Sequence, residues 1–181
     1  MSVDRIVLRD ADPTDQAWLA ALYADVRRDE VAQFGWDAAT AQAFLTQQFD
    51  AQQRAYRASH PDSRCQVIEC PADAATSPKD RRIGRLWVDR GSDAFHVLDI
   101  SVLSAWRRCG IGGHCLRGLL DEARTTACRV ELFVEDRNPA RRLYERLGFE
   151  PGASAPPYTA MRWLPAGAAI TIPAEVCHEQ A

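Results

Sequence analysis

One short stretch, Arg107 to Gly113 (RRCGIGG), constrains this chain more than any other part of its sequence. It stands between a segment typical of a strand, residues 95–102, and one typical of a helix, residues 113–127. Glycines lack a Cβ atom, so the backbone can bend sharply while its amide N–H groups converge near the start of the helix. Two arginines beside three glycines exceed what a plain tight turn needs. We therefore predict an anion-binding loop and favour a phosphate ligand over a purely structural turn.

The best-known nucleotide-binding motifs do not match this loop. The Gly-Lys-Ser/Thr ending of the phosphate-binding loop in nucleotide hydrolases is missing. A dinucleotide fingerprint requires a third glycine where Cys115 stands, and the chain does not begin with a series of βαβ units. The pattern that remains is Arg/Gln-x-x-Gly-x-Gly/Ala after a strand, which Arg107, Gly110 and Gly112 satisfy.

The overall charge and hydropathy exclude several classes of protein. The 181 residues carry 22 basic and 25 acidic side chains, so the net charge is -3 and lacks the basic excess of a general nucleic-acid binder. No apolar run reaches the roughly 18 residues of a membrane span, and the start of the chain lacks the core of a signal peptide. We expect a cytoplasmic protein with neither a nucleic acid nor a membrane as partner.

The length and the cysteines indicate one domain without a metal. Residues 1–164 suit a single domain, and residues 165–181 form a tail with no strong periodicity. The six cysteines are scattered, with no Cys-x-x-Cys pair and no histidine at zinc-site spacing. We expect reduced thiols and no metal ligands.

Charge is distributed unevenly along the chain. Residues 1–100 carry 12 basic and 16 acidic side chains, whereas residues 101–150 carry 9 and 7. Such a polarity suits a site for two substrates, with an anionic ligand near the positive segment and a cationic one near the acidic segment.

The periodicity predicts a mixed sheet in a layered α/β (α+β) architecture. Helices are expected after Asp12-Pro13, after Asp37, over residues 113–127 and from Asn138-Pro139 to the C′ residue Gly148, with connecting loops at residues 27–36 and 71–82. The expected strands cover residues 3–9, 65–70, 83–89, 95–102, 130–134 and 158–164.

Two segments, DISVLSAWRRCGIGG from Asp99 to Gly113 and NPARRLYERLGF from Asn138 to Phe149, resemble the GNAT superfamily of acyl-CoA-dependent N-acyltransferases. The resemblance covers about residues 83–150, by motifs in the same order as in the family. It implies a central mixed sheet with helices on both faces. The parallel strands near 95–102 and 130–134 are expected to splay apart where acyl-CoA inserts.

The same resemblance implies a set of cofactor contacts. Loop amides would receive the pyrophosphate of acetyl-CoA, and Ile100 and Val102 would pair with its pantetheine arm. Asn138 lies six residues before the tyrosine of the motif instead of the usual seven, and an asparagine before proline also suits a helix cap, so both roles stay open. The predicted contact residues are Ile100, Val102, Arg107, Arg108, Cys109, Gly110, Ile111, Gly112, Gly113 and Asn138.

Two residues are predicted to act in catalysis. The resemblance implies that Tyr144 protonates the departing CoA thiolate, because a phenol can donate a hydrogen bond to sulfur; the alternative is packing in its helix. Asp99 stands in mid-strand, where aspartate is disfavoured, and is a candidate general base, directly or through water. Strand alternation predicts that it shares a face with Phe95, Val97 and Ser101, opposite His96, and a merely exposed or capping role is the alternative.

The predicted function is N-acetyl transfer from acetyl-CoA to a primary amine by direct attack, without a metal and without an acyl-enzyme on Cys109. The acceptor is a small amine or a peptide N-terminus. In the family the loop at residues 27–36 commonly borders the acceptor pocket. A catalytically silent acyl-CoA-binding or regulatory module is the alternative, and a homodimer stays open.

Overall fold

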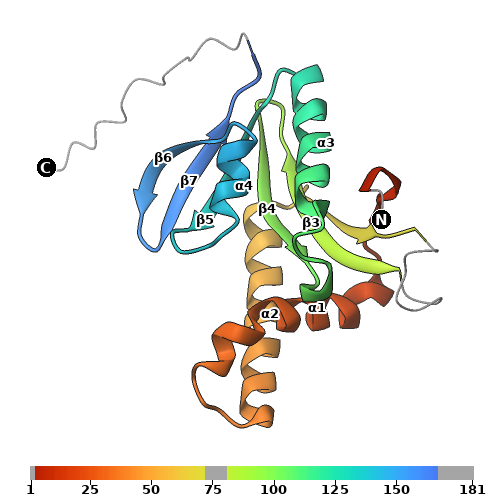
Figure 1. Ribbon diagram of the computed structural model, residues 1–181, viewed down its shortest axis with the longest axis vertical. Coiled ribbons are helices and arrows are strands. Elements are labelled where there is room, and N and C mark those ends of the chain that lie inside the picture. Colours follow the sequence, from red (N-terminus) through yellow and green to blue (C-terminus); the bar gives the residue numbers. More distant parts are fainter. Residues whose placement is uncertain (1–2, 72–80, 167–181) are drawn as a thin grey trace, which may run out of the picture.

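The computed structural model describes residues 3–71 and 81–166 of the chain and shows a mixed sheet of seven strands in the order β1-β2-β3-β4-β5-β7-β6 (Figure 1). All neighbouring strands are antiparallel except β4 and β5. The mixed α/β sheet expected from the sequence is therefore confirmed. The strands are β1 Val7–Asp10, β2 Arg64–Glu69, β3 Arg82–Arg90, β4 Ala94–Val102, β5 Arg129–Glu135, β6 Glu150–Ala155 and β7 Tyr158–Trp163.

Helices cover both faces of this sheet, as predicted. The α-helices are α1 Gln16–Ala32, α2 Ala38–Ser59, α3 Ile111–Thr125 and α4 Arg141–Arg146. On one face, α3 buries an apolar stripe that includes Leu116 and Leu120 against Phe95 and Val130 of β4 and β5. On the other face, α1 and α2 share a second cluster, Leu19, Tyr23, Val31, Leu45 and Phe49.

The parallel pair β4 and β5 separates part of the way along its length. Their register runs from Ala94↔Arg129 to Val97↔Leu132 and stops there, although β4 continues to Val102 and β5 to Glu135. The two strands thus splay apart in the middle of the sheet, as the family resemblance implied.

A β-bulge in β4 changes which side chains face which layer. Asp99 pairs with Trp87, but the next register pair is Val97↔Val88, so Leu98 has no counterpart on β3. Val97 and Ile100 therefore both face the core under α3, and Asp99 faces α2. The prediction that Asp99 shares a face with Phe95 and Val97 is wrong, and His96 lies on the same face as Asp99.

The predicted loop at residues 27–36 is mostly helical. Helix α1 continues to Ala32, and only the segment 33–37 turns toward α2. Ion pairs at i,i+3 spacing, Arg27–Glu30 and Arg28–Asp25, stabilise this last part of the helix. Val31 is buried between α1 and α2, which gives the extension a tertiary anchor.

Two element boundaries and one whole strand also differ from the prediction. The first strand begins at Val7, because residues 3–5 form a 3₁₀ turn. Strand β6 was not predicted, since EPGASA lacks β-branched and aromatic residues; it is an edge strand, where proline is tolerated. Helix α4 begins at Arg141, after the turn that follows Asn138.

Two further expectations concern the segments 71–82 and 165–181 and the presence of a membrane-spanning helix. Most of the predicted loop 71–82 and of the predicted tail 165–181 lies outside the described residues. Within residues 3–71 and 81–166, no helix is long and apolar enough to cross a bilayer.

Candidate functional site

A cavity of about 770 Å³ lies where β4 and β5 separate. Its walls come from the last turns of α1, the end of β4, the loop before α3, the segment after β5 and helix α4. The sequence-predicted residues among its lining are Ile100, Val102, Arg107, Arg108, Gly112, Asn138 and Tyr144. Residues that the two motifs place far apart in sequence thus surround one space.

No side chain caps the start of α3. The N-cap residue of this helix is Gly110, in the left-handed conformation with φ +80°. Arg108 also has a positive φ, 60°, so the backbone turns sharply before the helix. The first-turn amides of any α-helix have no intrahelical acceptor, and the helix dipole makes this end positive.

The cavity lining does not include the other predicted loop residues, Cys109, Gly110, Ile111 and Gly113. Ile111 and Gly113 are buried, and Cys109 is exposed with its thiol near the carbonyl oxygen of Arg107, at 3.6 Å. Their contribution to a bound anion would come from the backbone.

Helix α1 holds this loop in place. Asp25 accepts hydrogen bonds from the backbone nitrogen of Ser104 at 2.7 Å and from its hydroxyl at 2.9 Å. Arg107 donates to the carbonyl oxygens of Val102 and Val26, both at 3.4 Å. The sequence analysis missed Asp25, because no motif or spacing links a residue of the first helix to a loop 79 positions later.

The cavity carries charges of both signs. Arg107, Arg108 and Arg137 come from the loops before α3 and after β5. The acidic lining residues are Asp29 and Glu30 on α1 and Glu135 at the end of β5. The three arginines and Glu135 come from the positive segment 101–150, and Asp29 and Glu30 come from the acidic segment 1–100.

Tyr144 projects from α4 and is 7% exposed. Burial, with a smaller contribution from the negative charge of Asp99, raises the pKa of its phenol to about 12. The side chain therefore keeps its proton at neutral pH, as an acid requires. Its ring also packs against Phe149, with 5.8 Å between the centroids, so the helix-packing role is present as well.

Of the two roles left open for Asn138, the structure shows the capping role, and the cofactor contact stays a prediction. Its side-chain oxygen accepts a hydrogen bond from the backbone nitrogen of Ala140 at 2.9 Å, which is a capping contact in the turn before α4. The same residue lines the cavity.

Asp99 is engaged in a polar network on the α2 face. Its carboxylate accepts hydrogen bonds from Arg85 at 2.8 Å and from the Ser101 hydroxyl at 2.9 Å. Arg85 is 2% exposed and also donates to Gln52 of α2 at 3.0 Å. Asp99 is not among the residues that line the cavity.

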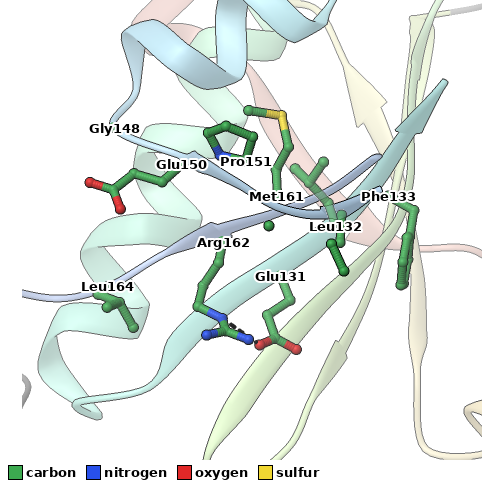
Figure 2. Close-up of a pocket in the computed structure, with 12 residues that line it drawn as sticks. Glu131, Leu132, Phe133, Gly148, Glu150, Pro151, Met161, Arg162 and Leu164 are labelled. Atoms are coloured by element: carbon green, nitrogen blue, oxygen red, sulfur yellow. Dashed lines mark hydrogen bonds and ion pairs between the residues drawn. The ribbon is translucent and has the colours of Figure 1, made fainter. Parts of the chain in front are cut away.

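A separate hollow of about 550 Å³ lies along β5, β7 and β6 (Figure 2). Glu131 accepts hydrogen bonds there from Arg162 at 3.0 Å and from Arg129 at 2.9 Å. Figure 2 shows Arg162 and Glu131 pointing toward each other, so these charges are satisfied within the protein. Within the described chain, no three or more His, Cys, Asp or Glu residues cluster closely enough to hold a metal ion.

The fold of this chain is shared with N-acetyltransferases of known structure. PaiA N-acetyltransferase from Thermoplasma acidophilum, solved with coenzyme A, matches 91% of this chain and 99% of its own with a TM-score of 0.65 and 14% identity. The match to the ribosomal-protein-S18-alanine N-acetyltransferase from Escherichia coli covers 92% of this chain and 98% of that protein, with a TM-score of 0.55 and 17% identity. The match to Arabidopsis thaliana NAA60, solved with a bisubstrate analogue, covers 90% of this chain and 99% of that protein, with a TM-score of 0.58 and 16% identity.

The sequence itself establishes the family. The model of the acetyltransferase (GNAT) family matches residues 36–149, and the chain belongs to this family. No curated protein matches the sequence in a direct comparison. The matched region contains the loop before α3 and Tyr144.

Proposed function

We propose that this protein transfers an acetyl group from acetyl-CoA to a primary amine. The observation that carries the proposal is the meeting, in one cavity at the strand splay, of Tyr144 with an uncapped helix N-terminus flanked by Arg107 and Arg108. Such a helix end binds phosphate through backbone N–H groups and the helix dipole. Family membership supports acetyl-CoA as the donor.

In this proposal the chain holds acetyl-CoA at two places. The amides of residues 108–113 receive the pyrophosphate, with Arg107 and Arg108 adding positive charge. The edge of β4 at Ile100 and Val102, beyond its last register pair with β5, pairs with the pantetheine arm. Asn138 contributes from the opposite wall, next to its capping bond with Ala140.

The reaction proceeds by direct attack. The amine nitrogen forms a bond to the thioester carbon, a backbone amide of β4 polarises the carbonyl, and the C–S bond breaks. Tyr144 then gives its proton to the CoA thiolate. Asp99 stays the predicted general base that removes the amine proton. In that role its carboxylate would also accept hydrogen bonds from Arg85 and Ser101.

The acceptor is a small primary amine or a peptide N-terminus. Acidic residues in the cavity wall, Asp29, Glu30 and Glu135, favour a cationic partner of either kind. The Escherichia coli neighbour is an N-acetyltransferase of an alanine in a ribosomal protein. The Arabidopsis neighbour was solved with a bisubstrate analogue. A cytoplasmic location stays a prediction.

Calorimetry tests the cofactor site. A Cβ at Gly112 would meet only Leu143 and Ile100, at 3.7 and 3.9 Å, so Gly112→Asp places a negative charge at the cavity without breaking the fold. We expect wild-type protein to bind acetyl-CoA and Gly112→Asp to lose binding. Gly118→Asp is the matched control, since it lies on the same helix with no atom within 4 Å of a new Cβ. Equal uptake by all three proteins would refute the site.

A thiol-release assay separates an enzyme from a silent acyl-CoA-binding module. Wild-type protein is incubated with acetyl-CoA and a panel of primary amines and N-terminal peptides. We expect amine-dependent CoA release with at least one class of acceptor. Binding of acetyl-CoA without turnover across the whole panel would favour the silent module.

A further inference from the structure

Two short hydrogen bonds join helix α1 to the segment between β4 and α3. Oδ2 of Asp25 accepts a hydrogen bond from the backbone nitrogen of Ser104 at 2.7 Å, and Oδ1 accepts one from the Ser104 hydroxyl at 2.9 Å. Ser104 opens the 3₁₀ turn Ser104–Trp106, which stands between β4 and the glycine-rich loop. In Figure 1 the green segment that leads into α3 lies next to α1.

The environment of the Asp25 carboxylate strengthens this contact. Its side chain is only 12% exposed, and its third partner is Arg28, which donates to Oδ1 at 3.1 Å. A carboxylate withdrawn from water is costly unless its oxygens accept hydrogen bonds. Hydrogen bonds to a charged acceptor are also about twice as strong as those between neutral groups. The carboxylate therefore holds Ser104 more firmly than a neutral side chain would.

The next residue of α1 holds the other end of the same turn. Arg107 directly follows the 3₁₀ turn, and its side chain donates to the carbonyl oxygen of Val26 at 3.4 Å. Asp25 and Val26 are consecutive, so one point on α1 contacts both Ser104 and Arg107. The turn is thus fixed at both of its ends.

The residues after this turn adopt a conformation that needs such support. Arg108 has φ 60°, and Gly110 has φ +80°. A residue with a Cβ raises the free energy of the chain at positive φ, and this conformation persists only where the surroundings hold it. Helix α3 fixes the loop on its C-terminal side. On the N-terminal side the fixed point is the turn that Asp25 and Val26 hold.

These contacts lie behind the wall of the cavity proposed for acetyl-CoA. Val26 lines that cavity from α1, and Arg107 and Arg108 line it from the loop. Neither Asp25 nor Ser104 is among the residues that line it. Any effect of Asp25 on the cofactor therefore has to act through the conformation of the loop.

We propose that Asp25 is a positioning residue for the cofactor. Through Ser104 it keeps residues 107–110 in the conformation whose amides receive the pyrophosphate of acetyl-CoA. The inference rests on the acetyl-transfer function proposed above. If the loop is competent in only a fraction of the molecules, the apparent Kd rises by the inverse of that fraction. Bound acetyl-CoA restores the loop, so the loss concerns affinity and not the structure of the complex.

The experiment measures acetyl-CoA affinity by calorimetry in wild type and in two variants of Asp25. Asp25→Ala removes both contacts to Ser104. A loop that is then competent in about one molecule in ten gives an approximately 10-fold higher Kd. Asp25→Asn keeps an oxygen for the Ser104 amide and offers an N–H to its hydroxyl, so we expect it to recover most of the affinity.

Hydrogen exchange supplies a readout that general destabilisation does not give. Without ligand, the backbone amides of residues 104–110 should exchange about 10-fold faster in Asp25→Ala than in wild type, because the loop opens locally. Saturating acetyl-CoA should return their exchange to the wild-type rate. Faster exchange spread over α3 and the sheet, or loop exchange that acetyl-CoA does not restore, would overturn the inference.

Asp121→Ala is the matched control. Asp121 pairs with Arg124 at i,i+3 on α3, as Asp25 pairs with Arg28 on α1, and its side chain is 70% exposed. The control thus removes an equivalent helix ion pair without touching the loop, and its Kd should equal that of wild type. A Kd raised equally in Asp121→Ala and Asp25→Ala would overturn the inference.

Ser104→Ala tests the partner and provides a milder variant should Asp25→Ala fail to fold. Ser104 is exposed, and the substitution removes only its hydroxyl, for which we expect an approximately 3-fold higher Kd. The double variant should bind as Asp25→Ala does, because the hydroxyl has already lost its acceptor. Fully additive losses, or a Kd that Ser104→Ala leaves unchanged, would contradict an action through Ser104.

The same titrations separate the failure of this inference from that of the acetyl-transfer proposal. Wild type that binds acetyl-CoA, with an equal Kd in Asp25→Ala, overturns the positioning role and leaves acetyl transfer intact. Wild type that takes up no acetyl-CoA overturns both. A higher Kd in Asp25→Ala, recovered in Asp25→Asn and accompanied by local exchange that acetyl-CoA reverses, supports the inference.

Discussion

The carboxylate of Asp99 accepts a hydrogen bond from Nε of Arg85 at 2.8 Å, and this pair lies on the face of the sheet opposite α3. The Arg85 guanidinium is buried beneath α2 and also lies over the Trp87 ring, 5.5 Å from its centroid. The ion pair joins β3 to β4 just after the bulge at Leu98. A negative charge at Asp99 therefore has a structural role whichever group removes the acceptor's proton.

Asp99→Leu should destabilise the fold strongly. The substitution leaves the Arg85 charge buried without its partner, which costs about 3–5 kcal/mol. The double variant Arg85→Met/Asp99→Leu removes both charges and should recover most of this loss. Urea unfolding of the three proteins measures the difference. A double variant no more stable than Asp99→Leu would show that the pair does not act through charge.

Acid should weaken the ion pairs that Asp15, just before α1, forms with Arg9 and Arg82. Asp15 is 1% exposed and accepts hydrogen bonds from Arg9 at 2.6 and 2.9 Å and from Arg82 at 3.2 Å. The Arg9 hydrogen bonds are the main reason that the pKa of Asp15 lies well below its ordinary value. Its contribution to stability is thus present above the unfolded-state pKa, about 3.9, and is lost as pH falls through the folded-state pKa.

Asp15→Asn tests this dependence on pH. At neutral pH the variant should be about 2 kcal/mol less stable than wild type, since hydrogen bonds to a charged group are lost. The difference should narrow only in strongly acidic solution, where the wild-type carboxylate also becomes protonated. Urea midpoints at a series of pH values provide the measurement; a constant difference down to the lowest pH would contradict the assignment.

Tyr144→Phe should lower turnover without weakening cofactor binding. The variant keeps the ring that packs on Phe149 and removes only the hydroxyl, so the fold should be unchanged. We expect kcat to fall about 100-fold, with acetyl-CoA affinity close to wild type. Because the pKa of Tyr144 is raised to about 12, its ionisation should not reduce wild-type activity below about pH 10. Equal kcat values would leave Tyr144 with its packing role alone.

Gly110 and Gly112 should respond differently to alanine. Gly110 has φ +80°, where a Cβ costs about 1–2 kcal/mol, so Gly110→Ala should lower stability and disturb the loop. A Cβ at Gly112 makes only ordinary contacts, so Gly112→Ala should be as stable as wild type or slightly more stable. Thermal unfolding compares the two variants. The reverse order would contradict the loop conformation.

The sequence predicted the parts of this fold that depend on local signals. The turn chemistry of Arg107 to Gly113 and the apolar stripe of α3 identified the open helix end. A helix start was also expected after Asp12-Pro13, and there Asp12 forms a capping box with Asp15 at the 3₁₀ turn Pro13–Asp15, directly before α1. These features arise from residues a few positions apart, which is why a pattern in one chain reveals them.

Three errors arose where one residue or one long-range contact overrode the local pattern. The bulge at Leu98 adds a residue to β4 and moves Asp99 to the face of His96, which alternation cannot foresee. Val31 keeps α1 helical because it is buried against residues of α2. Strand β6 forms because β7 offers a partner, although its own residues have little β propensity.

Local residue chemistry was therefore enough to predict the anion loop, since a helix start and a glycine turn together can bind phosphate. The resemblance of two motifs indicated the family and Tyr144. Only the folded chain brought Asp25 to Ser104, paired Asp99 with Arg85 and placed the rings of His60 and His96 side by side. Those contacts join residues on different elements, and their formation depends on strand register and on how α1 and α2 pack against the sheet.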